Sequence, residues 1–197
     1  FFSNTSHFQI QSLKDFFKLQ WEKREGLQEA LRIGFPSILS QALIGLHIMA
    51  VTWLALPFGF EAVEALGIGA RLDTLAVFPA LSVMAAVVSL CGQNAGAKNW
   101  DRVHESIKRG LITIFVFLGA LGLIVFFSKS FLIGLFKPSP EAIPLLTTYL
   151  SVLSLAYPLV GLGIVSSGAF QGLGKGWPYL ILGSLRLLVL SFPLGFI

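Results

Sequence analysis

Residues 74–97 read TLAVFPALSVMAAVVSLCGQNAGA and contain no Asp, Glu, Lys or Arg. A helix that crosses a bilayer needs roughly 20 mostly apolar residues to cover a hydrocarbon core about 30 Å thick. Comparable apolar blocks lie at residues 33–60, 111–128, 142–174 and 177–197. Membrane barrels would instead alternate apolar and polar residues along strands of about ten residues. The sequence therefore predicts an all-α, polytopic membrane helix bundle with about five transmembrane helices.

The composition disfavours a water-soluble domain and an enzyme. The chain is 55% hydrophobic and 12% charged, and this charged share is about half that of a typical soluble domain. One cysteine, Cys91, excludes a disulfide framework within the chain, and three histidines with one cysteine form no ligand cluster. We find no nucleophile–base pair and no phosphate-binding loop in the sequence. We predict no catalytic residue and no metal site.

The apolar blocks divide the chain into two parts. Residues 1–30 are expected to form the end of a preceding helix and an amphipathic cytoplasmic linker, and residues 31–197 a transmembrane bundle. The predicted helices occupy about residues 31–57, 65–95, 109–133, 142–170 and 177–197. The pattern of the linker favours a plain connector over a lipid- or partner-sensing segment. Because the chain starts at Phe1 and stops inside an apolar run, we expect it to be a fragment.

Basic residues set the expected orientation. If the five helices cross in alternation, the far side receives only Lys129 and Lys137. The other side receives ten basic residues: Lys14, Lys18, Lys23, Arg24, Arg32, Lys98, Arg102, Lys108, Arg109 and Lys175. By the positive-inside rule this side is cytoplasmic, so residues 1–32, 96–110 and 171–177 are predicted to face the cytoplasm. The net charge of +4 is then explained by attraction of the basic residues to the lipid bilayer, which is the expected partner, and we expect no nucleic acid.

Polar side chains inside the apolar blocks are candidates for a substrate or ion pathway, because charges in hydrocarbon are costly and usually face a cavity or a partner. The candidates are Gln41, His47, Arg71 and Asp73. Arg71 and Asp73 lie two positions apart near the outer end of the second helix. This spacing argues against a simple helical ion pair, and the interfacial position would also permit snorkelling. His47 could relay protons, but a neutral histidine that is hydrogen-bonded within the bundle accounts for it more simply.

Three motifs in order carry a family resemblance: RIGFP at residues 32–36, CGQNAGA at 91–97 and GAFQGLGK at 168–175. Over roughly residues 31–197 the chain resembles the multidrug and toxic compound extrusion (MATE) family. The matching residues, expected to be structural, are Pro36, Gly92, Gln93, Asn94, Gly96, Ala97, Gly168, Gly172, Gly174 and Arg186. A bridge to a neighbouring helix would also account for Arg186.

The resemblance implies twelve helices in two six-helix lobes. The five blocks would be helices seven to eleven of the second lobe, with residues 1–30 linking the lobes. It further implies an antiporter in the bacterial inner membrane, in which a gradient of H⁺ or Na⁺ drives multidrug efflux. Its partners would be small organic substrates and the first lobe of the same chain, and it would need no cofactor besides the coupling ion.

Two departures from the family pattern affect the coupling site. Some family members carry a Glu in helix seven and an Asp in helix ten, where this chain has Ile44 and Val160. We therefore transfer no ion site from the family, and we expect the coupling carboxylate in the first lobe. The alternatives are a flippase for a lipid-linked oligosaccharide from the same superfamily and a non-transporting membrane scaffold.

Overall fold

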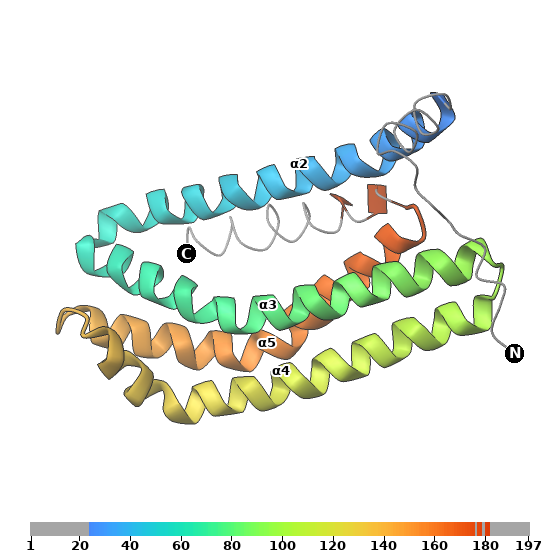
Figure 1. Ribbon diagram of the computed structural model, residues 1–197. Coiled ribbons are helices and arrows are strands. Elements are labelled where there is room, and N and C mark those ends of the chain that lie inside the picture. The colour runs from blue at the N-terminus through green and yellow to red at the C-terminus, as the bar shows by residue number, and fades with distance from the viewer. Residues whose placement is uncertain (1–23, 176, 179, 182–197) are drawn as a thin grey trace, which may run out of the picture.

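The computed structural model describes residues 24–175, 177, 178, 180 and 181. Within this part the chain forms long helices and no strand: α2 (Arg24–Ala55), α3 (Phe60–Gly96), α4 (Trp100–Phe136) and α5 (Ala142–Gly172), with the short 3-10 helix η1 (Leu56–Phe58) between α2 and α3 (Figure 1). All four long helices contain segments that are long and apolar enough to cross a membrane. The predicted class, an all-α polytopic bundle, is confirmed.

The helices extend further than the predicted spans. Residues 24–30 of the predicted linker belong to α2, and α3 begins at Phe60 rather than near residue 65. The predicted helix at 109–133 begins at Trp100, so the amphipathic segment before Gly110 continues α4 without a break. Hydropathy marks the embedded length of a helix, whereas polar residues at the interface extend it into water. The fifth predicted helix, 177–197, lies mostly outside the described residues.

Helices α3, α4 and α5 form one packed group, in which α5 contacts both α3 and α4 (Figure 1). Its core contains fully buried Ile114 and Leu118 of α4 beside Leu150 and Val165 of α5. Glycine allows close approach here, because a Cβ at Gly122 would overlap the carbonyl oxygen of Ser154. In contrast, α2 joins α3 through η1, makes few contacts with it and diverges from it (Figure 1).

Two helix ends share one hydrogen-bonding pattern. After α3, the amide of Asn99 donates to the carbonyl of Asn94 (2.9 Å) and Lys98 has φ 58°. After α5, the amide of Lys175 donates to the carbonyl of Phe170 (2.9 Å) and Gly174 has φ 72°. Both are Schellman motifs, which satisfy the last carbonyls of a helix and place one residue in the left-handed region. Both motifs lie on the side predicted to be cytoplasmic.

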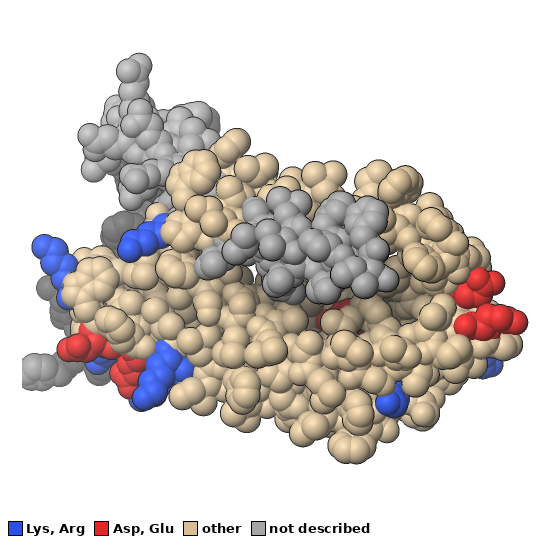
Figure 2. All heavy atoms as spheres, turned by 180° about the vertical axis from the view of Figure 1, so that it is seen from behind, with Lys and Arg blue, Asp and Glu red and all other residues tan. Residues whose placement is uncertain are grey.

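Charged and apolar side chains occupy different parts of the surface. On the face shown in Figure 2, most Lys, Arg, Asp and Glu residues lie at the two ends of the bundle, and the band between them is almost free of charge. Many large apolar side chains of this bundle are exposed, among them Phe78, Phe117, Phe127 and Leu159. Such a surface is costly in water but is the expected boundary with lipid tails.

Candidate functional site

A carboxylate lies between helices in the half of the bundle that is predicted to face outward. Asp73 of α3 accepts two hydrogen bonds from α5: the Tyr149 hydroxyl donates to Oδ2 (2.6 Å) and the Tyr157 hydroxyl donates to Oδ1 (2.8 Å). Tyr157 is buried, and Asp73 and Tyr149 are half-buried. Each carboxylate oxygen thus has one neutral donor. We call these three residues the Asp73 site.

The spacing of the tyrosines on α5 and a glycine on α3 make this contact possible. Tyr149 and Tyr157 are eight residues apart, so they lie on one stripe of α5, about 12 Å apart along the axis. Gly69 lies one turn before Asp73, and a Cβ there would overlap the ring of Tyr149. The absent side chain at Gly69 leaves room for the tyrosine ring to cross α3 and reach the carboxylate.

Contacts between α4 and α5 give the depth of the site. The Lys129 ammonium donates to the Ser151 hydroxyl (2.6 Å), and Ser151 lies between Tyr149 and Tyr157 in α5. Lys129 is also the residue at which the uncharged block 111–128 ends. The site therefore lies near the end of an uncharged block, on the side that is predicted to face outward. Asp73 is not at the end of its helix, however, because α3 begins 13 residues earlier, about 20 Å away.

The site pairs its carboxylate with hydroxyls and not with a basic side chain. Among the described residues, no Lys or Arg forms an ion pair with Asp73, and Arg71 is exposed. A carboxylate only accepts hydrogen bonds, whereas a protonated carboxyl also donates one. The oxygens of Asp73 and of the two tyrosines are hard ligands of the kind that small cations prefer. Within the described ranges, no group of three or more His, Cys, Asp or Glu could hold a metal ion.

The other predicted pathway residues do not join this site. Gln41 is exposed and His47 is half-buried, both on α2. Since α2 diverges from α3 beyond η1 (Figure 1), the structure does not bring them together with Asp73. The two tyrosines were missed by sequence reasoning. In the sequence, the only sign of a role was a polar hydroxyl inside an apolar block. Tyrosine is common near membrane interfaces, so this sign does not single out a site.

The residues of the family motifs bring the ends of α3 and α5 together. A Cβ on Gly172 would lie 2.6 Å from the carbonyl oxygen of Val88, and one on Gly168 would lie 2.5 Å from Cγ of Met84. A Cβ on Gly92 would lie 3.4 Å from the carbonyl oxygen of Gly172, so the two motifs face each other. These glycines permit close backbone packing.

The remaining motif residues shape the ends of helices. The side-chain amide of Gln93 donates to the Ser89 hydroxyl (3.2 Å), and the side-chain amide of Asn94 donates to the Leu90 carbonyl (2.8 Å). Gly96 ends α3, Ala97 follows it, and Gly174 forms the turn after α5. Pro36 lies within α2. Arg186 is outside the described residues.

A second carboxylate, which the sequence did not single out, binds the loop between α4 and α5. The Ser139 amide donates to Oε1 of Glu64 (3.1 Å), and the Ser139 hydroxyl donates to Oε2 of the same carboxylate. Ser139 belongs to the connection between α4 and α5, whereas Glu64 is in the first turns of α3. The loop between two helices is thus bonded to the third.

Comparison with known proteins agrees with this architecture. A family model described as MatE matches residues 36–197. The chain is 24% identical over 190 residues to the "Probable multidrug resistance protein NorM" of Thermotoga maritima, covering 92% of this chain and 41% of that protein. It is 28% identical over 163 residues to the "Probable multidrug resistance protein YpnP" of Bacillus subtilis, covering 83% and 37%.

A solved structure is similar as well. The outward-facing conformation of a multidrug resistance MATE family transporter of the MOP superfamily superposes with a TM-score of 0.82 at 26% identity, covering 89% of this chain and 39% of that one. The chain spans about two fifths of the length of these relatives. With its membrane-length helices and a family match over most of its length, this multi-pass membrane chain belongs to the MatE family.

Proposed function

We propose that this chain is part of a cation-coupled antiporter, driven by H⁺ or Na⁺, that exports organic compounds such as drugs across the bacterial inner membrane. Relatives named as multidrug resistance proteins support the substrate class. The transported compounds would be cationic or amphipathic, and the coupling ion would be the only cofactor. The first lobe of the same chain would complete the transport path.

The Asp73 site is the observation that carries the coupling part of the proposal. An ionisable residue within a membrane helix is costly, so the few that occur usually face the bundle interior and mark a pathway or a relay. When Asp73 is charged, both tyrosine hydroxyls donate to it. When it is protonated, its own O–H needs an acceptor, so the bonds between α3 and α5 rearrange. Ion binding at this carboxylate would thereby change the contact between two helices.

Asp73 occupies a different helix from the acids that some family members carry. The corresponding positions are Ile44 on α2 and Val160 on α5, and neither side chain can bind an ion. Asp73 on α3 is therefore the carboxylate of this lobe that we assign to ion coupling. A further coupling acid in the first lobe stays a prediction.

Transport in everted vesicles that contain the full-length protein tests the proposal. We expect dye or drug uptake that depends on a proton or sodium gradient, and an Asp73→Asn variant should lower this uptake at least about tenfold. Asp101→Asn is the matched control, because Asp101 is an exposed carboxylate in the first turn of α4; its uptake should stay within about twofold of wild type.

Two results would contradict the proposal in different ways. Absence of uptake under either gradient would reject the antiporter. Full gradient-driven uptake by Asp73→Asn would leave the antiporter standing and would place the coupling acid elsewhere, with the first lobe as the next part to examine.

A further inference from the structure

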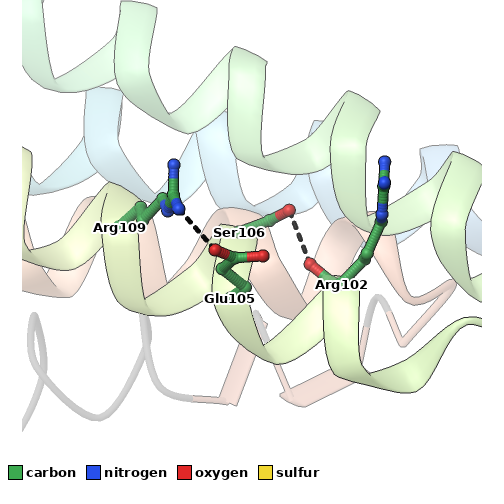
Figure 3. Close-up of polar contacts among 4 residues, drawn as sticks. All are labelled: Arg102, Glu105, Ser106 and Arg109. Carbon is green, nitrogen blue, oxygen red and sulfur yellow. Dashed lines mark hydrogen bonds and ion pairs between the residues drawn. The ribbon is translucent and has the colours of Figure 1, made fainter.

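A groove opens between α3 and α4 in the half of the bundle that is predicted to face the cytoplasm, away from the Asp73 site. It has a volume of ≈ 610 Å³. One wall is α4, which contributes Arg102, Glu105 and Arg109, and the other is α3, which contributes apolar side chains such as Val83 and Leu90. In Figure 3, Arg102 and Arg109 extend from α4 on the side of α3.

The spacing of the two arginines matches a single ligand. They are seven residues apart, which places them on one face of α4 about 10 Å apart along the axis. The Arg109 guanidinium forms an ion pair with Glu105 on its own helix (Figure 3). A guanidinium has five N–H donors, so this pair leaves most of the donors of Arg109 available for an anion. Two positive charges and one negative charge give the groove a net charge of +1.

The groove lies at the level where a membrane changes from headgroups to tails. Trp100, exposed at the start of α4, is the kind of residue that marks the membrane interface. The uncharged block begins at residue 111, directly after Arg109 and Gly110. The polar end of the groove therefore faces the interface, and its wall on α3 continues with Ala86 and Val83 toward the hydrocarbon core. Among the described residues, no helix other than α3 and α4 lines it.

We propose that this groove binds an anionic phospholipid of the cytoplasmic leaflet, such as phosphatidylglycerol. Its phosphate would lie between Arg102 and Arg109, because guanidinium groups bind phosphate through paired N–H donors. One acyl chain would lie along Val83 and Leu90. Glu105 can accept hydrogen bonds from the hydroxyls of a glycerol headgroup. The site is independent of drug transport and would exist in any conformation that keeps α3 and α4 together.

Lipid binding to the purified full-length protein tests this site. The delipidated protein in neutral detergent is titrated with phosphatidylglycerol, phosphatidylethanolamine or phosphatidylcholine, and bound lipid is counted by native mass spectrometry. Wild type should bind phosphatidylglycerol at least about fivefold more tightly than the two zwitterionic lipids, and R102Q/R109Q should lose about tenfold or more of that affinity.

A matched control separates a built site from general surface charge. Lys98 and Lys108 lie at the same end, and neither lines the groove, so K98Q/K108Q removes the same charge and should change the affinity less than about twofold. R102K/R109K keeps the charge but not the planar fork, and should show an intermediate loss. Melting curves in detergent verify that each variant is folded.

Either of two results would overturn the proposal. Equal losses in R102Q/R109Q and K98Q/K108Q would show diffuse attraction to a basic surface. Equal wild-type affinity for phosphatidylglycerol and phosphatidylethanolamine would show that the net charge of the groove selects no anionic lipid.

Discussion

Asp73 and Glu105 are both carboxylates on long apolar helices, yet their surroundings differ in every respect. Asp73 is half-buried and accepts hydrogen bonds from two neutral hydroxyls, on residues 76 and 84 positions away in the sequence. Glu105 is exposed and pairs with Arg109, four positions away on the same helix. Water screens the second pair, and exposed pairs of this kind contribute less than about 1 kcal/mol. The exposed contact is therefore the one that is easier to predict from sequence, whereas the contact to which we assign ion coupling depends on tertiary packing.

The largest expected effect comes from removing both donors of the Asp73 site. The Tyr149→Phe, Tyr157→Phe double variant leaves a carboxylate between helices without these two hydrogen-bond donors, so gradient-driven transport should fall about tenfold or more. Each single variant should lose less. Thr148→Val is the control, because the exposed Thr148 hydroxyl donates to the carbonyl of Pro144 on its own helix, and it should transport normally. Wild-type transport by the double variant would show that the tyrosine hydroxyls do not contribute to coupling.

A smaller effect is expected from Gly69→Ala. The added Cβ would overlap the ring of Tyr149, so the ring must move and its hydrogen bond to Asp73 is weakened; overpacking of this kind costs about 1–3 kcal/mol. Thermal unfolding in detergent and transport rate are the two readouts. Gly67→Ala is matched closely, because a Cβ there meets nothing within 4 Å. If both alanine variants melt at the same temperature, Gly69 is not needed to seat the tyrosine.

The smallest effect is expected from Glu105→Gln. The ion pair it removes is exposed on both sides, with 77% of the Arg109 side chain and 54% of the Glu105 side chain accessible. The unfolding free energy should change by less than about 0.5 kcal/mol after screening by water. Chemical denaturation of the full-length protein measures it. A change of more than about 1 kcal/mol would mean that this pair is part of a larger network and that the contrast with Asp73 is overstated.

The sequence predicted the bundle well, because a soluble domain rarely contains uncharged runs long enough to cross a bilayer. It predicted the ends of the helices less well, since α4 begins at Trp100, in a polar segment that hydropathy assigns to water. The side-chain oxygen of Asn99 accepts a hydrogen bond from the amide of Arg102 (3.4 Å) and so caps this helix. A cap of this type can be recognised from sequence, but the predicted bounds followed the apolar block, which begins after the cap.

The candidate site was predicted only in part. Asp73 can be singled out from the sequence because a charge inside an apolar block is costly and therefore rare. Its partners cannot, because the facing stripe of α5 depends on how two helices pack against each other, and the residues in contact are more than 70 positions apart. Gly69 is the clearest example. Its role depends on the position of the Tyr149 ring, and the sequence around Gly69 gives no information about that position.

The bond between Glu64 and the Ser139 loop has a mechanical consequence. Any motion that separates α4 from α5 at this loop must also pull the loop away from α3. Three helices are thus fastened together at one point and favour displacement as a single rigid block. In contrast, α2 is joined to that block by one 3-10 turn and by Gly59, whose φ of 101° is open to glycine but rarely to other residues. Within the described residues, we therefore expect any bend of the bundle to occur at this joint.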